Sequence, residues 1–349
     1  MLHMVQELAP PRVLLTQGDP NGIGPEVVLK AASEPRRLRQ MRLIAVGNPD
    51  IFKAHLATLH TDPVRWNVIR DIEEAVTGKL NLICPPACMG GPDVPSFGAI
   101  DPKAGAQSMH AVTWATEACL QGHADLVVTA PISKEAISKA GYDVPGHTEY
   151  IAAMAGGEPL MIMTAGRFRV ALATTHIPIS AVADALSPEH LARILRQVQS
   201  CLRDDFGRND PTIAVLGLNP HAGDGGVIGT EEVDWLLPMC DEFRANGWRI
   251  SGPHPPDGFF GVGKHTEPDV ILAMYHDQGL VPFKLLAFDK GVNVTAGLSV
   301  VRTSPDHGTA FSIAGKDQAS AVSMGAAIDQ GVTIWTNRVV KGNPTSAAR

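Results

Sequence analysis

Short runs of apolar, β-favouring residues alternate along this chain with segments whose apolar residues recur at helical spacing. We expect strands at 12–17, 42–47, 125–130, 160–165, 169–175, 212–218, 269–275 and 291–297. Helical patterns follow several of these runs, as at 25–33 and 104–123. The alternation of strands and helices predicts an α/β architecture with a largely parallel sheet.

The clearest helix begins at Ser187, a serine N-cap followed by proline in the first turn. Its apolar residues then fall on one helical face: Leu191, Ile194, Leu195, Val198 and Leu202. We expect another helix to begin near Thr230, because the carboxylates of the next two residues suit the positive end of a helix dipole.

Composition narrows the class of protein. The chain has 349 residues, of which 44% are hydrophobic and 19% charged, as in a globular protein with one or two domains. Its net charge of −7 without a basic run argues against nucleic acid as a partner. No apolar stretch approaches the length of a membrane span, and the N-terminus lacks the order of a secretory signal. We therefore expect a cytoplasmic protein that does not enter membranes.

Three histidines each come shortly after an apolar β-like run: His176, His221 and His276. Ligands gather at the carboxyl ends of strands in open α/β folds, and three imidazoles there suit a catalytic metal with an open coordination position. Asp277 stands next to one of them, where a carboxylate can orient the ligand or act as a base. Taken alone, this set fits a zinc hydrolase as well as an oxidoreductase.

Residues suited to binding an anion occur at four further positions: His147, Thr148, Lys284 and Arg302. His147 and Thr148 follow a glycine at the start of an apolar helix, where polar groups can face an anion. Arg302 and Asn293 bracket a β-like run, and the arginine guanidinium favours bidentate recognition of an oxyanion.

Residues 18–26, GDPNGIGPE, form a glycine-rich connection between a predicted strand and a predicted helix. The segment is not the GxGxxG dinucleotide fingerprint, because Asp and Pro occupy the wrong places. Its glycines allow either a sharp structural turn or close approach to a ligand, and Pro25 suits the start of the helix.

Read together, the blocks GDPNGIGPE, TAPISK, GHTEY, TTHIP, LNPHAGDGG, YHDQGL and RTSPDHGTA resemble the 4-hydroxythreonine-4-phosphate dehydrogenase family of the pyridoxal-phosphate pathway. The resemblance covers nearly the whole chain. It implies the isocitrate/isopropylmalate-dehydrogenase-like fold, in which two α/β domains have a cleft between them. We expect one domain over 1–130 and 285–349 with much of the cofactor site, and a second over 131–284 with metal ligands and dimer contacts. The resemblance also implies a homodimer whose subunits share the active site.

The resemblance assigns roles to individual residues. It implies metal ligands at His176, His221 and His276, and substrate-binding positions at His147, Thr148, Lys284, Asn293 and Arg302. The loop His307, Gly308, Thr309 and Ala310 is similar to the nucleotide-binding loop of the wider superfamily. We therefore expect NAD or NADP and one divalent metal ion, zinc, cobalt or magnesium. The family more often has alanine where this chain has Asn21.

The implied reaction is oxidation of 4-phosphohydroxy-L-threonine at its C3 hydroxyl, followed by decarboxylation to 3-amino-2-oxopropyl phosphate. Asp277 is the first candidate for the base and Lys134, in TAPISK, the second. Relatives that oxidise threonate or erythronate 4-phosphate, or aromatic cis-dihydrodiols, are the nearest alternatives. The anion-binding positions favour a phosphorylated substrate. A zinc hydrolase leaves the HGTA segment unexplained, and a non-catalytic metal-binding protein leaves most of the polar residues without a role.

Overall fold

The chain forms two compact units, and the second is inserted into the first. The computed structural model describes residues 8–60 and 64–342. Unit 1 runs as far as Pro159 and resumes at Leu298, whereas unit 2 is the continuous segment Leu160–Gly297. The N-terminal residues 1–7, on which the expectation of no secretory signal partly rests, lie outside the described residues.

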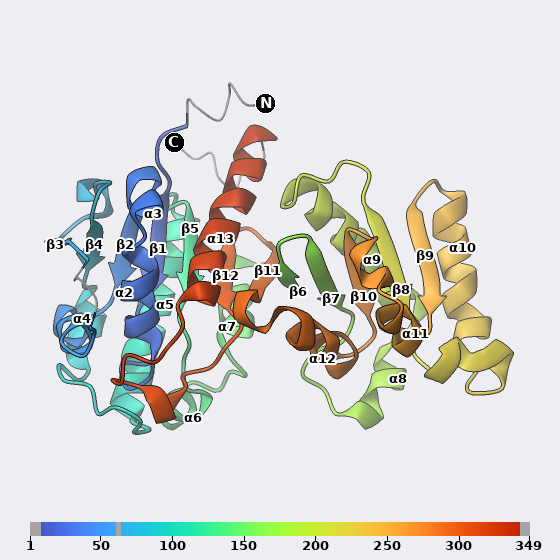
Figure 1. Cartoon of the computed structure of the whole chain (residues 1–349), viewed down its shortest axis with the longest axis horizontal. Helices are drawn as coiled ribbons and strands as arrows, with labels where there is room; N and C mark the ends of the chain where they lie inside the picture. The colour runs from blue at the N-terminus through green and yellow to red at the C-terminus, as the bar shows by residue number, and fades with distance from the viewer. Residues whose placement is uncertain (1–7, 61–63, 343–349) are drawn as a thin grey trace. The chain divides into compact units, whose positions relative to one another are not determined.

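Unit 1 contains a parallel sheet with the order β3-β4-β2-β1-β5-β12 (Figure 1). Its strands are β1 (Arg12–Thr16), β2 (Arg42–Val46), β3 (Trp66–Ile69), β4 (Leu80–Ile83), β5 (Leu126–Thr129) and β12 (Arg302–Pro305). The central strands are buried, with no alternation of polar and apolar residues, as expected where helices cover both faces.

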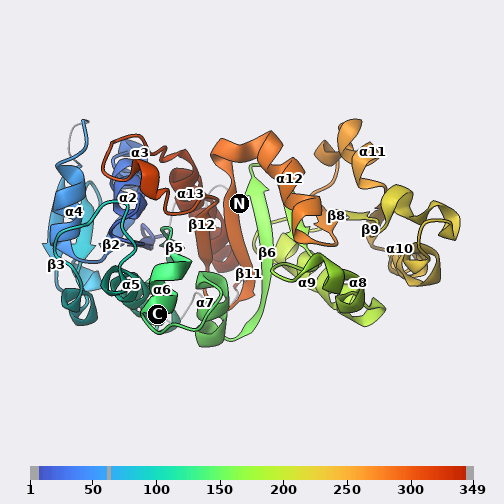
Figure 2. The ribbon, with the colours of Figure 1, turned by 90° about the horizontal axis from the view of Figure 1, so that it is seen from below.

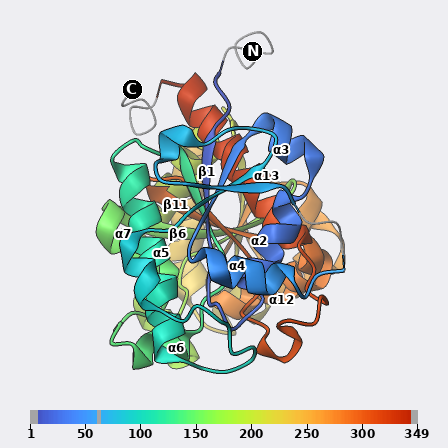
Figure 3. The ribbon, with the colours of Figure 1, turned by 90° about the vertical axis from the view of Figure 1, so that its left-hand side faces the viewer.

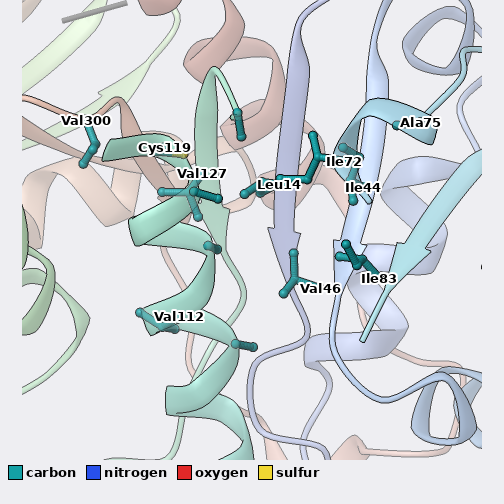
Figure 4. Close-up of a cluster of buried hydrophobic side chains, with 14 of the residues drawn as sticks. Leu14, Ile44, Val46, Ile72, Ala75, Ile83, Val112, Cys119, Val127 and Val300 are labelled. Atoms are coloured by element: carbon teal, nitrogen blue, oxygen red, sulfur yellow. The ribbon is translucent and has the colours of Figure 1, made fainter. Parts of the chain in front are cut away.

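Helices cover the unit 1 sheet on both sides. They are α2 (Gly24–Ala32), α3 (Pro35–Gln40), α4 (Pro49–Leu56), α5 (Pro102–Leu120), α6 (Lys134–Lys139), α7 (His147–Ala155) and α13 (Val322–Val340), with 3-10 segments at Ile72–Glu74, Pro86–Gly90 and Phe311–Ile313. Figure 3 shows α2, α3 and α13 on one face of the strands and α5, α6 and α7 on the other. Between the sheet and α5, Leu14, Val127 and Val112 belong to one buried apolar cluster (Figure 4).

Unit 2 contains strands in the order β11-β6-β7-β10-β8-β9. They are β6 (Gly157–Ala165), β7 (Phe168–Leu172), β8 (Thr212–Leu216), β9 (Arg249–His254), β10 (Val270–Ala273) and β11 (Val292–Leu298). β7, β10, β8 and β9 are parallel, and β6 pairs antiparallel with β7 through a tight turn.

The helices of unit 2 lie on both faces of its sheet. They are α8 (Val182–Ala185), α9 (Pro188–Asp204), α10 (Leu237–Ala245), α11 (Pro256–Gly261) and α12 (His276–Ala287). A π-helical turn covers Glu232–Leu236, and 3-10 segments cover Ile179–Ala181, Pro220–Gly226, Lys264–Thr266 and Phe288–Lys290. Leu280 and Phe283 of α12 pack into a cluster with residues of β7 and β10. Figure 2 shows α12 and α9 on opposite sides of these strands.

The structure confirms the predicted α/β architecture and all eight predicted strands. The helix predicted at Ser187 is also present: the Ser187 hydroxyl accepts a hydrogen bond from His190 N at 3.1 Å. The five apolar residues predicted to share one face of that helix are all buried. The sequence patterns did not indicate β3, β4, β9 and β12. Each is short, polar at one or more positions, or interrupted, as at Gly252-Pro253 in β9. None of the helices that the structure describes is long and apolar enough to span a membrane.

Candidate functional site

The three strand-end histidines follow three adjacent strands of unit 2. His176 comes after β7, His276 after β10 and His221 after β8, and β10 pairs with both of the other two strands in parallel. Parallel strands present their carboxyl ends at the same edge of a sheet, which is where ligands bind in open α/β folds. The three histidines therefore follow strand ends that lie at the same edge of this sheet.

His176 and His276 lie close together at that edge. Their ring centroids are 5.9 Å apart, and a cavity of about 380 Å³ is lined by both rings, by Asp277 and by apolar residues such as Ile179. Asp277 Oδ1 lies 2.7 Å from His276 Nδ1, so a neutral His276 donates its Nδ1 proton to the carboxylate. The lone pair of the ring is then on Nε2, as a metal ligand requires.

His221 stands on an unusual turn. Residues 221–225 all have left-handed backbone conformations, with φ between 45° and 79°. Three of the five are not glycine: His221, Ala222 and Asp224. A left-handed conformation costs an L-residue about 1–2 kcal/mol, so the surrounding structure must hold this turn in place.

The donors fit a divalent metal in kind, because neutral imidazoles are common ligands of zinc and cobalt. The rings of His176 and His276 lie together on adjacent loops, and His221 stands on the loop that follows the next strand. Within residues 8–60 and 64–342, no three His, Cys, Asp or Glu side chains already form a metal-binding group. The metal-ligand role of the three histidines stays a prediction.

In unit 1, Arg302 forms the centre of a second polar cluster. It lies on β12 beside β5, is only 3% exposed, and its Nη2 and Nε donate hydrogen bonds to Thr129 Oγ1 at 2.7 and 3.2 Å. Its Nη1 donates to Thr148 Oγ1 at 3.3 Å. Burial lowers the pKa of Arg302 to about 10, and the nearby Glu149 carboxylate acts in the opposite direction. The guanidinium stays charged at neutral pH.

His147 lies next to this cation at the start of α7. Its Nε2 is buried and has no hydrogen-bond partner among the residues that the structure describes. Burial lowers the pKa of His147 well below its usual value, and the positive charges of Arg302 and Lys134 lower it further. A neutral imidazole, a hydroxyl and two cations thus gather at one place in unit 1. A bound anion would supply the partner that His147 Nε2 lacks.

The glycine-rich segment after β1 packs against the predicted cofactor loop. Ile23 N donates a hydrogen bond to Thr309 O at 2.9 Å. A side chain at Gly22 would place its Cβ 2.8 Å from Thr309 O, so only glycine permits this approach. Pro25 stands in the first turn of α2, as predicted. The segment therefore supports residues 307–310 through backbone contacts.

The predicted cofactor loop has special features of its own. Ala310 has a left-handed φ of 44°, which turns the chain into the 3-10 segment that follows. His307 Nε2 is buried and has no partner within the described part of the chain, and burial lowers the pKa of His307.

The remaining predicted residues lie in unit 2. Lys284 is on α12, about two helical turns after His276. Asn293 is on β11, and its side-chain oxygen Oδ1 is buried without a hydrogen-bond partner in the described residues.

The predicted site residues therefore divide between the two units. Unit 1 holds Lys134, His147, Thr148, Arg302, His307, Gly308, Thr309 and Ala310, and unit 2 holds His176, His221, His276, Asp277, Lys284 and Asn293. Sequence reasoning missed Thr129, which holds the Arg302 guanidinium, and Glu232, which braces the turn of His221. Thr129 is the last residue of β5 and lies inside the predicted strand 125–130, so its place near a carboxyl end of a strand was the one available signal.

A family model and the sequence relatives of this chain point to the same protein family. The model of the family described as pyridoxal phosphate biosynthetic protein PdxA matches residues 39–331. The 4-hydroxythreonine-4-phosphate dehydrogenase of Bacteroides thetaiotaomicron is 43% identical over 329 residues, which are 94% of this chain and 89% of the relative. The enzyme of the same name from Ruegeria is 41% identical over 320 residues, covering 90% of this chain and 94% of the relative.

Solved structures agree with the sequence relatives. The crystal structure of 4-hydroxythreonine-4-phosphate dehydrogenase from Klebsiella pneumoniae has a TM-score of 0.81 and 35% identity, with 94% of this chain and 99% of that one covered. A terephthalate 1,2-cis-dihydrodiol dehydrogenase from Burkholderia xenovorans is more distant, with a TM-score of 0.63 and 27% identity, covering 93% of this chain and 98% of that one.

Proposed function

Because this chain belongs to the family of the pyridoxal phosphate biosynthetic protein PdxA, we propose that it oxidises 4-phosphohydroxy-L-threonine at the C3 hydroxyl. NAD or NADP is the electron acceptor. The resulting β-keto acid loses carbon dioxide to give 3-amino-2-oxopropyl phosphate. This reaction belongs to the cytoplasmic synthesis of pyridoxal phosphate.

The polar cluster of unit 1 is the observation that carries the proposal. Arg302 supplies a buried positive charge, Thr148 a hydroxyl, and His147 a buried ring nitrogen without a partner in the described residues. A phosphate group satisfies all three, since it accepts several hydrogen bonds and its charge opposes that of a guanidinium. A cis-dihydrodiol without an anionic group would leave His147 Nε2 without an anionic partner, so the cluster favours a phosphorylated substrate.

Lys134 adds a second positive charge near this cluster, because its charge acts on His147. Lys284 and Asn293 of unit 2 complete the proposed set of substrate-binding residues. Asn293 Oδ1 is suited to accept a hydrogen bond from the ammonium or hydroxyl group of the substrate, since it is buried and has no partner among the described residues.

A divalent ion of zinc, cobalt or magnesium, bound by His176, His221 and His276, would supply Lewis acidity that lowers the pKa of the substrate hydroxyl. Asp277 keeps the His276 proton on Nδ1 and leaves Nε2 for coordination. The Asp277 carboxylate is exposed, and we assign it as the first candidate to accept the hydroxyl proton, with Lys134 as the second.

Residues 307–310 are the proposed cofactor-binding loop. The backbone of His307, Gly308, Thr309 and Ala310 follows β12, the strand that carries Arg302. The contact between Ile23 and Thr309 fixes the position of this loop within unit 1. In unit 1, the proposed cofactor-binding loop thus follows directly in the chain after the strand of Arg302, which belongs to the proposed phosphate-binding cluster.

We further propose that the enzyme is a homodimer whose subunits share the active site. Large apolar side chains on α12 and just beyond it are exposed: Val281 by 54%, Leu285 by 82% and Phe288 by 68%. They recur at intervals of four and three residues, so they lie on one helical face, and exposed apolar faces of this kind mark protein interfaces. Sedimentation analysis tests this: Leu285→Lys should convert a wild-type dimer to monomers, and a monomeric wild-type enzyme with full activity would contradict it.

The central experiment is a nicotinamide-reduction assay with three substrates: 4-phosphohydroxythreonine, erythronate 4-phosphate and an aromatic cis-dihydrodiol. We expect the highest kcat/KM with 4-phosphohydroxythreonine, loss of activity after chelation and its return with added metal. Preference for erythronate 4-phosphate would assign the chain to a different reaction within the same fold. Hydrolysis without any reduction of the nicotinamide would rule out a dehydrogenase.

A further inference from the structure

The left-handed turn that carries His221 is built around a buried carboxylate. Glu232 is 2% exposed and begins the π-helical turn that precedes α10. Its Oε1 accepts hydrogen bonds from Leu218 N and Asn219 N, both at 2.8 Å. Its Oε2 accepts a third bond from Asn219 Nδ2 at 2.9 Å. One side chain therefore fixes the two residues that lead into the turn.

The same carboxylate also contacts the turn on the other side of His221. A Cβ at Gly223 would stand 2.8 Å from Glu232 Oε2, so the backbone at 223 lies directly against the carboxylate. A Cβ at Gly217 would stand 3.0 Å from the Cα of Ala222 and 3.2 Å from Glu232 Oε1. His221 is thus flanked before and after by segments that rest on Glu232.

Asn219 completes the arrangement. Its Nδ2 also donates to Glu231 Oε2 at 2.7 Å, so both amide protons are used, and its backbone oxygen accepts a bond from Ala222 N at 3.0 Å. Only an ionised carboxylate accepts all three bonds at position 232 without presenting a proton of its own. A glutamine there would place its NH₂ group against the NH₂ group of Asn219.

We propose that Glu232 is the positioning residue for His221. It holds the left-handed turn that carries the imidazole of His221, on the loop next to those of His176 and His276, without contacting substrate or metal itself. The inference rests on the proposed metal-binding function. π-Helical turns frequently occur at functional sites, which agrees with the place of Glu232 in the fold.

The test is cobalt binding by the full-length apoprotein, measured by calorimetry and by the Co²⁺ absorption spectrum. We expect Glu232→Gln to weaken Co²⁺ binding on the order of 10- to 100-fold and to change the spectrum, as for other residues that orient metal ligands. Asp234→Asn is the matched control, because Asp234 lies two residues further on and is exposed. It should bind Co²⁺ like the wild type. A folded Glu232→Gln protein with wild-type affinity and spectrum would overturn the proposal.

A second pair of variants tests the contact without removing the carboxylate. Gly223→Ala and Gly225→Ala both place alanine at a left-handed position, with φ of 79° and 67°, but only Gly223 has Glu232 behind it, whereas Gly225 faces open space. We expect Gly223→Ala to weaken Co²⁺ binding at least about tenfold more than Gly225→Ala, in line with the effect of disturbing an orienting contact. Equal effects would contradict the proposal, even if Glu232→Gln fails to fold.

His221→Ala separates this inference from the function on which it rests. If His221→Ala binds Co²⁺ with wild-type affinity, the proposed metal role of His221 is wrong and the inference is wrong with it. If His221→Ala loses Co²⁺ binding while Glu232→Gln and Gly223→Ala keep it, the metal role stands and Glu232 does not position the ligand.

Discussion

Arg302 and Thr129 are joined by two hydrogen bonds, both to the single Thr129 hydroxyl oxygen, from Nη2 at 2.7 Å and from Nε at 3.2 Å. The two residues come from adjacent parallel strands that are far apart in the sequence. Because both side chains are buried, the hydroxyl fixes the direction of the guanidinium and supplies an acceptor that water cannot replace.

Thr129→Val should therefore raise KM for the phosphorylated substrate about tenfold, since a hydrogen bond to a charged group contributes about 1.5–3 kcal/mol. Thr129→Ser keeps the hydroxyl and should restore a KM close to that of the wild type. Steady-state kinetics and thermal unfolding of both variants check this. A Thr129→Val enzyme that loses stability but keeps its KM would limit Thr129 to a structural role.

Asp277→Asn should weaken metal binding on the order of 10- to 100-fold, because the amide holds the His276 Nδ1 proton less strongly than the carboxylate. Metal titration of the apoprotein measures this effect, and kcat as a function of pH reports any further loss of a base. Asp289→Asn is the control, since Asp289 is exposed just beyond α12. If Asp277→Asn keeps both its metal affinity and its kcat, neither role of Asp277 is correct.

Gly22→Ala should raise KM for the nicotinamide cofactor more than KM for the substrate. The new Cβ would meet Thr309 O at 2.8 Å and Thr309 Cβ at 2.9 Å, which forces the 307–310 loop away from its place. We expect the free energy of unfolding to fall by about 1–3 kcal/mol, as for other overpacked sites. Gly90→Ala is the control, because nothing lies within 4 Å of a Cβ at that position. If Gly22→Ala destabilises the protein but leaves the cofactor KM unchanged, residues 307–310 do not bind the cofactor.

Two buried groups, Asp19 of the glycine-rich segment and His55 of α4, give opposite pH dependences of stability. Burial raises the pKa of Asp19 to about 6, and the charge of Asp101 adds to this, whereas the Asn21 backbone N–H opposes it. The unfolded Asp19 carboxyl loses its proton above 3.8, but the folded one keeps it up to about pH 6. The contribution of Asp19 to stability is therefore complete below pH 3.8 and is lost as the pH rises through 6.

His55 behaves in the opposite way. Burial lowers its pKa to about 4, although the hydrogen bond to Pro20 O at 2.8 Å opposes this shift. The unfolded histidine takes up a proton below pH 6.5, but the folded one stays neutral to about pH 4. The contribution of His55 is therefore complete above pH 6.5 and is lost as the pH falls through 4.

Each of these two pKa shifts corresponds to about 3 kcal/mol of unfolding free energy. In the wild type the two contributions change in opposite directions between pH 4 and 6.5 and nearly cancel. Asp19→Asn should lose more unfolding free energy than the wild type on acidification through this range, and His55→Gln should lose less or gain. Denaturant unfolding at both ends of the range measures the two slopes. Parallel slopes in the wild type and both variants would show that neither group carries the effect.

The features predicted correctly from the sequence are those that depend on residues close together in the chain. Eight strands, the α9 N-cap and the family were confirmed, because apolar runs, capping residues and ordered motifs are contiguous in the chain. The three histidines were selected by their place after strands, and the sheet order makes those strands neighbours. Their metal role, and the substrate and cofactor roles, stay predictions.

What the sequence could not show depends on contacts between distant segments. Nothing local at Thr129 indicates that β12 will pair with β5 and bring Arg302 to its hydroxyl. The left-handed turn of His221 contains three residues that rarely adopt this conformation, so local preference argues against it, and a carboxylate from a later turn stabilises it. The crossings between units near Pro159 and Leu298 fall within strands and carry no turn signal.

The insertion of unit 2 into unit 1 has a consequence for biosynthesis. A ribosome completes Leu160–Gly297 before it makes β12 and α13, and domains generally fold as units during synthesis. The proposed metal-binding histidines thus belong to a segment that can fold before β12, the last strand of unit 1, has been synthesised. Arg302 and the 307–310 loop are synthesised after unit 2. The nascent chain therefore acquires the residues proposed to bind phosphate and nucleotide only after the three histidines have been synthesised.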